Sequence, residues 1–234
     1  RLNTLLMNVE ERDKWLTENE FEFDSWEHDD IFFFVNKTSR LLNSELFDDG
    51  KLSIQDPAGG LVVKLLDPRK NETITDVCAA PGGKSSYMAQ LMENTGKIMA
   101  FDSNFNRLRK YARGLARLKV DNVDAQMMDM TTAQISKTTK VLLDVPCTGT
   151  GVMSKRADLR WRRTIKSLYE MVQIQRDLLF NIAQYVKKGG VIIYSTCSIE
   201  QEENWHVINY FLQANKNWEV DSAEKYVPKE FVDE

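Results

Sequence analysis

The pattern of apolar residues changes near residue 74, and this change constrains the fold more than any other feature of the chain. From there, short apolar runs alternate with amphipathic stretches, which is typical of strand-helix-strand units around a parallel sheet. The expected strands cover residues 73–78, 97–102, 122–127, 140–144 and 191–194. The expected helices cover residues 85–93, 104–118, 165–187 and 202–213, the third stopping at Gly189-Gly190. The pattern predicts a doubly wound α/β fold.

The first fifty residues have a different pattern. A strand is expected at 2–7, a helix at 9–19, and two aromatic-rich strands at 21–26 and 31–35. These elements are too few to bury an independent core. We therefore expect residues 1–50 to form a small α+β appendage, residues 51–234 to form the main domain, and the turn-prone stretch 48–50 to separate them.

The net charge of −4 is distributed unevenly along the chain. Residues 1–50 carry a net charge of −8, residues 51–199 carry +10 and residues 200–234 carry −6. A basic middle between acidic flanks is compatible with a polyanionic partner such as a nucleic acid, because phosphate contact needs only local positive charge. A solvated charged surface without a partner explains the distribution equally well.

Cysteine usage and hydropathy indicate the class of protein. The three cysteines, Cys78, Cys147 and Cys197, lie far apart and have no paired spacing, so neither a metal site nor a disulfide framework is expected. No apolar run has the length of a membrane helix and no secretion signal is visible, so we expect a soluble, cytoplasmic protein. Because the chain begins with Arg1 rather than methionine, we expect the natural protein to extend further upstream.

A loop of small residues between the first main-domain strand and helix predicts a ligand site. Its backbone can approach a ligand closely along Cys78, Ala79, Ala80, Pro81, Gly82, Gly83 and Lys84. A P-loop would need glycine at position 78, and the dinucleotide pattern GxGxxG is absent, so these two kinds of site are disfavoured. Asp102 ends the next strand, where a carboxylate can bind ribose hydroxyls, and Asp129 and Asp144 follow the third and fourth strands. The arrangement predicts a nucleoside-bearing cofactor.

Two of the cysteines follow strands directly. Cys147 lies in the loop after the fourth strand and Cys197 in the loop after the fifth, so both are expected at the same sheet edge as the small-residue loop. Each stands among polar, glycine or serine residues, which make a poor core and a good active-site surface. Cys78 is expected to be a buried, unreactive thiol.

Together these motifs resemble the RsmB/Sun/Nop family of RNA 5-methylcytosine methyltransferases. The family's cofactor motif is similar to residues 76–85, its proline-cysteine motif to residues 144–151 and its threonine-cysteine-serine motif to residues 196–198. Similar residues also stand at Gln55-Asp56, Gln175 and Glu203-Asn204, so the resemblance covers about residues 51–215. The glycine- and phenylalanine-rich closing strand of the family is not visible, and we expect the end of the sheet to be truncated.

The resemblance implies a Rossmann-like class I methyltransferase sheet that uses S-adenosyl-L-methionine (S-adenosylmethionine). It implies that Cys197 adds to C6 of cytosine, which activates C5 for methylation, and that Cys147 assists the later release. Asp102 and Asp129 are expected to hold ribose and adenine, and Arg107 matches a family arginine near the cofactor.

Two further side chains are assigned roles in the reaction itself. Asp144 is expected to hydrogen-bond N3 of the base or protonate it there. Lys84 is the cation that we expect to favour the Cys197 thiolate, although a solvated lysine in the first turn of a helix remains an even alternative.

RNA is the expected partner, because both cysteines are present, whereas in DNA-modifying relatives the proline-cysteine residue attacks the base. A basic segment follows the Cys147 loop, and its contact residues are expected to be Lys155, Arg156, Arg160 and Trp161, through phosphate contact and base stacking. The target cytosine should be unpaired or flipped out.

Residues 1–50 resemble the tail of the family's RNA-recognition-like subdomain. The likeness to bacterial Sun-type enzymes favours ribosomal RNA over transfer RNA, and nothing in the sequence specifies an oligomeric state.

Three other functions compete with this interpretation. A methyltransferase acting on an exocyclic amine would need a polar-Pro-Pro-aromatic loop after the fourth strand, which residues 144–147 do not match. A non-catalytic RNA-binding or ribosome-assembly factor would be favoured if either cysteine were replaced. A nucleotide-dependent oxidoreductase is disfavoured by the missing dinucleotide fingerprint.

Overall fold

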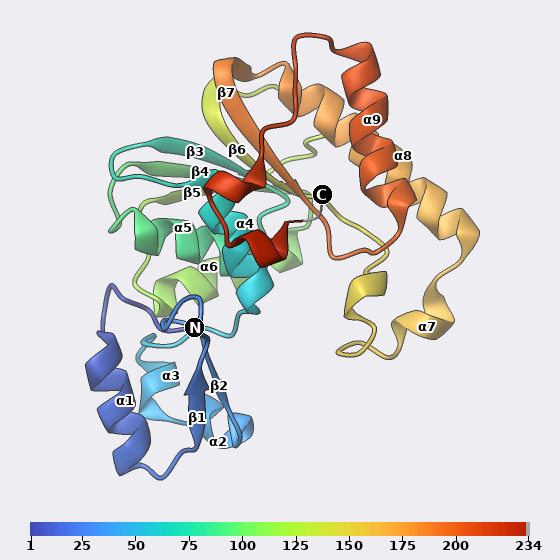
Figure 1. The fold of residues 1–234 in the computed structure, drawn as a ribbon. Helices are drawn as coiled ribbons and strands as arrows, with labels where there is room; N and C mark the ends of the chain where they lie inside the picture. Colours follow the sequence, from blue (N-terminus) through green and yellow to red (C-terminus); the bar gives the residue numbers. More distant parts are fainter. Residues whose placement is uncertain (233–234) are drawn as a thin grey trace.

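The computed structural model describes residues 1–232, and its centre is a five-stranded parallel sheet (Figure 1). The strands are β3 (Thr73–Val77), β4 (Lys97–Asp102), β5 (Val123–Met127), β6 (Thr138–Asp144) and β7 (Val186–Ser195). Their order in the sheet is β5-β4-β3-β6-β7. The chain starts in the middle, winds to one edge and then returns to the other. The α/β fold predicted from the sequence is therefore confirmed.

Helices cover both faces of this sheet. Its helices are α4 (Pro57–Leu66), α5 (Gly83–Leu91), α6 (Phe105–Arg117), α8 (Ile165–Ala183) and α9 (Trp205–Ala214). Within β6, Val141 and Leu143 belong to the core cluster that includes α8 and α9, whereas Leu142 belongs to the cluster with α4 and α5. Because successive side chains of a strand point to opposite faces, the two clusters lie on opposite sides of the sheet. The near-continuous apolar runs of the strands reflect this two-sided burial.

The start of the last strand differs from the prediction. Helix α8 ends at Ala183 and β7 already begins at Val186, so Gly189-Gly190 lies inside the strand and does not end a helix. The Tyr185 carbonyl accepts a hydrogen bond from the Thr138 amide (2.9 Å), and the register with β6 shifts between Thr138 and Lys140. Pairing with β6 thus begins before the glycines, which accommodate an irregularity of the strand.

The N-terminal part consists of α1 (Val9–Glu18), β1 (Phe23–Ser25), β2 (Phe33–Val35), α2 (Thr38–Leu42) and α3 (Glu45–Asp48). Strands β1 and β2 pair antiparallel, and Asn8 with Glu11 forms a capping box that starts α1. The strand expected at 2–7 is wrong: Leu2 forms an isolated bridge with Leu52, and a turn follows. The turn is fixed by the side-chain amide of Asn3, which donates to the carbonyls of Gly50 and Leu118, each at 2.9 Å.

The N-terminal part packs against the first helices of the main sheet, below α5 and α6 in Figure 1. The guanidinium of Arg1 donates to Gln90 Oε1 (2.8 Å) and Ser86 Oγ (2.9 Å) in α5. The carboxylate of Asp29 accepts a hydrogen bond from Tyr87 (3.2 Å) and forms an ion pair with Lys64 (2.6 Å). No helix among the described residues is long and apolar enough to span a membrane.

Candidate active site

The loops that follow β3, β6 and β7 meet at one edge of the sheet. These strands are neighbours and run in the same direction, so their carboxyl ends coincide. Asp144 at the end of β6 is in register with Ser195 at the end of β7. Beyond the strands, the amide of Val145 donates to the carbonyl of Ser195, and the amide of Gly151 donates to that of Cys197, both at 3.0 Å. These bonds hold the two cysteine loops together beside the predicted cofactor loop.

The cofactor loop turns tightly between β3 and α5. Cys78 has a φ of +61°, and the amide of Ala79 donates to the carbonyl of Phe101 in β4 (2.9 Å). Gly82, the N-cap of α5, has a φ of +103°, and a Cβ atom there would lie 2.8 Å from the Tyr111 ring of α6. Both the backbone conformation and the close approach therefore require glycine at this position.

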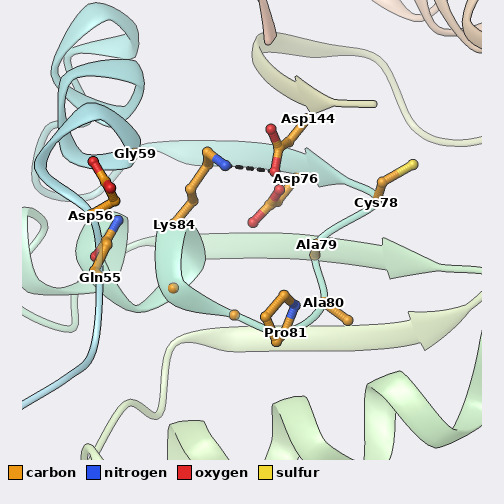
Figure 2. Close-up of a pocket in the computed structure, with 12 residues that line it drawn as sticks. Gln55, Asp56, Gly59, Asp76, Cys78, Ala79, Ala80, Pro81, Lys84 and Asp144 are labelled. Carbon is orange, nitrogen blue, oxygen red and sulfur yellow. Dashed lines mark hydrogen bonds and ion pairs between the residues drawn. The ribbon is translucent and has the colours of Figure 1, made fainter. Parts of the chain in front are cut away.

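A cavity of about 200 Å³ lies between this loop, the end of β6 and the start of α4 (Figure 2). It is lined by Gln55, Asp56, Gly59, Asp76, Cys78, Ala79, Ala80, Pro81, Gly82, Gly83, Lys84 and Asp144. Both polar atoms of the Gln55 side-chain amide are buried and have no hydrogen-bond partner among the described residues. Because an unpaired buried amide is costly, the cavity fits a ligand that offers both donors and acceptors. In the sequence, Gln55 is marked only by its similarity to a family residue, and its buried, unpaired amide appears only in the folded chain.

The other predicted cofactor residues lie outside the lining of this cavity. Buried Asp102 accepts a hydrogen bond from the amide of Ala80 (3.2 Å), and the guanidinium of Arg107 is 3.5 Å from the same carboxylate. Arg107 also donates to the carbonyl of Ala80, so both side chains adjoin the cofactor loop. Asp129 is exposed, and hydrogen bonds from the amide and hydroxyl of Thr131 lower its pKa. The structure thus joins Asp102 and Arg107 through their side chains, whereas the side-chain hydrogen bonds of Asp129 are made with Thr131.

Asp76 is a buried carboxylate beneath the cavity. The hydroxyl of Ser85 donates to it (2.5 Å). Burial raises the pKa of Asp76 to about 7, which the hydrogen bond from Ser85 opposes and the nearby charge of Asp144 reinforces. The cavity therefore contains a carboxyl group that titrates near neutral pH.

Cys147 and Cys197 lie next to each other, with their Sγ atoms 3.1 Å apart. The hydrogen bond from Cys147 lowers the pKa of the Cys197 thiol to about 7, against the effects of burial and of the Asp144 charge. The same hydrogen bond, together with burial, raises the pKa of Cys147. Burial raises the pKa of Cys78 to about 12. Cys197 is also exposed whereas Cys147 is half-buried, so among the three cysteines a thiolate is favoured at Cys197.

Lys84 forms an ion pair with Asp144 across the cavity, with Nζ 2.6 Å from Oδ2 (Figure 2). Ser195 donates to the other carboxylate oxygen of Asp144 (2.7 Å). The charge of Lys84 also lowers the pKa of Cys197, but less than the hydrogen bond from Cys147 does. The direct partner of Lys84 is therefore Asp144, and its effect on the thiol acts over a longer range.

The basic segment begins in the loop after Cys147 and includes the short helix α7 (Leu159–Arg162). Lys155 forms an ion pair with Asp56, which lines the cavity, and Arg156 lies 3.9 Å from Asp158. Arg160 is exposed, and the Trp161 side chain is 89% exposed. The segment presents an aromatic ring and positive charge to solvent, while Lys155 connects it to the cavity.

Comparison with known proteins gives consistent matches. A family model described as 16S rRNA methyltransferase RsmB/F matches residues 63–231. The probable ribosomal RNA small subunit methyltransferase B of Bacillus subtilis (strain 168) is 35% identical over 194 residues, covering 81% of this chain and 43% of the relative. The tRNA (cytosine(72)-C(5))-methyltransferase of Pyrococcus horikoshii is 35% identical over 188 residues, covering 80% of this chain and 48% of the relative. The chain thus spans less than half the length of these relatives.

A solved structure matches the fold over most of the chain. The crystal structure of a methyltransferase homolog protein from Pyrococcus horikoshii aligns with a TM-score of 0.80 and 35% sequence identity. The alignment covers 92% of this chain and 68% of that one. Sequence and fold comparisons therefore identify the same group of proteins.

Proposed function

This chain belongs to the 16S rRNA methyltransferase RsmB/F family, and we propose that it transfers a methyl group from S-adenosylmethionine to C5 of a cytosine in RNA. The observation that carries the proposal is the pair of thiols 3.1 Å apart at the edge of the sheet beside the cofactor loop. One relative is named as a cytosine-C5 methyltransferase of tRNA, which supports both the base and the class of substrate.

We propose that the cavity and the adjoining loop hold the cofactor. S-adenosylmethionine, when bound, supplies an electrophilic methyl group. The unpaired amide of Gln55 and the carboxylate of Asp102 offer hydrogen bonds on two sides of the loop, and Arg107 orients Asp102. Adenine binding by Asp129 is proposed from the family resemblance alone. Because Gly82 has no side chain, the loop packs closely against Tyr111 of α6 and enters α5 with a positive φ.

The thiol geometry supports a covalent mechanism. The Cys197 thiolate adds to C6 of the cytosine, and electron density moves toward N3. Asp144 hydrogen-bonds or protonates N3 with a proton supplied by Lys84 beside it, and the proton returns to this pair when the thiolate leaves. Bound S-adenosylmethionine would supply the methyl group to C5 and leave as S-adenosylhomocysteine, after which C5 loses its proton to a base. Finally the C6–S bond breaks and its electron pair returns to Cys197. The S–H of Cys147 stabilises the departing thiolate through the contact that it makes in the free protein.

We propose that ribosomal RNA is the substrate, with transfer RNA as the alternative. The relatives include enzymes named for each class, and the family model is described by 16S rRNA. We further propose that Lys155, Arg156, Arg160 and Trp161 contact the RNA, because exposed cations and an exposed indole stand beside the Cys147 loop.

We propose that residues 1–50 are part of an RNA-recognition-like subdomain and that residues 51–234 form the catalytic domain. The antiparallel pair β1–β2 beside α1, with an apolar cluster drawn mostly from residues 1–50, supports this division.

Two cysteine variants test the mechanism. With labelled S-adenosylmethionine and total RNA from a strain lacking the enzyme, Cys197→Ala should abolish methyl transfer, because no thiolate can add to C6. Cys147→Ala should permit attack but slow release, so that a covalent protein-RNA adduct accumulates on a denaturing gel. The double variant is the matched control and should form no adduct.

Mapping the methylated base completes the test. Methyl transfer to adenine or to protein, or full activity of Cys197→Ala, would contradict the proposal. RNA binding without methyl transfer by the wild-type chain would instead support a non-catalytic assembly factor.

A further inference from the structure

We infer that two consecutive residues, Glu203 and Asn204, position the two thiols separately, Glu203 setting Cys147 and Asn204 setting Cys197. They lie where a short 3₁₀ turn, η2 (Gln201–Glu203), meets α9. The inference rests on the proposed function and adds positioning residues that act through hydrogen bonds to the cysteine loops. In the sequence, Glu203 and Asn204 are marked only by their similarity to family residues, which assigns them no role.

Glu203 holds the residues on both sides of Cys147. Its carboxylate is fully buried and accepts hydrogen bonds from the amide of Thr148 (2.8 Å) and from Thr148 Oγ1. It also accepts one from Gln175 Nε2 (2.9 Å), and the same Gln175 nitrogen donates to the carbonyl of Pro146 (2.9 Å). The backbone is thus fixed immediately before and after the cysteine, which determines where the Cys147 thiol can point.

Asn204 holds the residues on both sides of Cys197 in the same way. Its Oδ1 accepts a hydrogen bond from Thr196 Oγ1 (2.8 Å), and its Nδ2 donates to the carbonyls of Ser198 (3.0 Å) and Glu200 (2.9 Å). Every hydrogen-bonding atom of the amide is therefore directed at the Cys197 loop.

The pair itself is anchored to the core. The hydroxyl of Tyr194 in β7 donates to the carbonyl of Glu203 (2.8 Å), and the helix that follows is packed through buried Val207 and Phe211. The carboxylate of Glu203 has no cationic partner among the described residues, so hydrogen bonds from the Cys147 loop and Gln175 stabilise its buried charge. Because Glu203 is anchored to the core and its carboxylate is hydrogen-bonded by the Cys147 loop, it restrains the position of that loop.

Separate anchors predict separate kinetic defects. Displacing Cys147 removes the donor that stabilises the departing thiolate. At a pH above the midpoint of Cys197, where the thiolate forms without that donor, release therefore slows while attack continues. Displacing Cys197 moves the nucleophile itself, so attack slows and no adduct builds up. The two loops also contact each other through the hydroxyls of Thr148 and Ser198 (3.3 Å), so each variant is expected to affect the other step slightly.

The test compares Glu203→Gln and Asn204→Ala in two assays at about pH 9, above the expected midpoint of Cys197 with or without the Cys147 donor. Adduct formation on ordinary RNA reports slow release. The rate of attack is measured with RNA that contains 5-fluorocytidine and spans the region modified by the wild-type enzyme. Because fluorine cannot leave C5 as a cation, each attack that is followed by methylation leaves a trapped adduct. Glu203→Gln should trap within about threefold of wild type, turn over about tenfold more slowly and accumulate adduct on ordinary RNA. Asn204→Ala should trap about tenfold more slowly and accumulate none.

Glu202→Gln is the matched control, since it makes the same chemical change one residue away at a side chain with no described hydrogen bond, and it should behave as wild type. Thermal unfolding and affinity for S-adenosylhomocysteine establish that each variant is folded. If Glu203→Gln does not fold, Thr148→Ala removes one of its bonds and should give a milder release defect. Identical defects in the Glu203 and Asn204 variants would overturn the inference, whereas a wild-type chain that neither methylates nor traps would overturn the proposed function.

Discussion

At the residue scale, the reactivity of Cys197 depends on its neighbour Cys147. An unperturbed thiol has a pKa of about 8.5 and is mostly protonated at neutral pH. The hydrogen bond from Cys147 lowers the pKa of Cys197 to about 7, so more of this thiol is ionised at neutral pH than of a free thiol. In the proposed mechanism, Cys147 therefore has two effects: it favours the thiolate before attack and stabilises the same sulfur when it leaves.

The pH dependence of attack follows from this pKa. The single-turnover rate of adduct trapping should fall about tenfold per pH unit below pH 7 and level off above it, because only the thiolate attacks. In Cys147→Ala the hydrogen bond is lost, so the midpoint should move up toward about 8.5. Burial raises the pKa of Asp76, which lines the proposed cofactor cavity, to about 7. Cofactor binding can therefore also change with pH, and S-adenosylmethionine is kept saturating at every pH. A midpoint unchanged by the substitution would contradict the assigned role of Cys147.

At the scale of elements, the start of α5 determines the shape of the cofactor loop. The N-cap Gly82 is left-handed and packs against Tyr111 of α6, so the loop can only reach the helix through a residue without a side chain. The same helix carries Lys84 in its first turn, which places the lysine opposite Asp144. The loop, the cation and the packing between α5 and α6 are therefore one structural unit.

Gly82→Ala tests this unit. The positive φ and the 2.8 Å approach to Tyr111 should lower the free energy of unfolding by about 1–3 kcal/mol and weaken binding of S-adenosylhomocysteine. Gly114→Ala in α6 is the control, because nothing lies within 4 Å of its Cβ position and alanine favours a helix by up to about 1 kcal/mol. Urea unfolding and calorimetric titration measure the two effects. Equal stability of the two variants would contradict the requirement for glycine.

At the scale of the whole molecule, the N-terminal part and the sheet are joined by partly buried polar contacts. Asp29 bonds to Tyr87 in α5 and Lys64 in α4, and the side chain of Arg117 in α6 donates to the carbonyls of Phe47 and Leu52. Because these bonds connect two hydrophobic clusters, we expect the chain to unfold in one cooperative step.

Asp29→Ala should therefore destabilise the whole chain and not only its N-terminal part. The change leaves the Tyr87 hydroxyl and the Lys64 ammonium without their partner, which should cost about 1–3 kcal/mol of unfolding free energy. Far-ultraviolet circular dichroism and tryptophan fluorescence should report one shifted midpoint. Asp24→Ala, at an exposed position of β1, should leave that midpoint in place. Two separate transitions in the wild type would contradict this coupling.

The sequence by itself determined the sheet and the place of the cysteines. Apolar periodicity predicted five strands, and β4 covers the predicted range 97–102 without change. Since parallel strands expose their carboxyl ends at one edge, the positions of Cys147 and Cys197 after two strands were sufficient to bring them to that edge. The proposed roles of the two cysteines, attack by Cys197 and release by Cys147, come from the family resemblance and cannot be inferred from apolar periodicity.

Only the tertiary structure decided how the side chains at that edge pair. The ion pair of Lys84 with Asp144 joins residues 60 positions apart, and Glu203 bonds to Thr148 across 55. The early start of β7 likewise depends on pairing with β6, which overrode the local tendency of Gly189-Gly190 to end a helix. Local sequence patterns determine the backbone preference of each segment and which of its faces is apolar. Contacts between distant residues depend on how the elements pack, and therefore appear only in the folded chain.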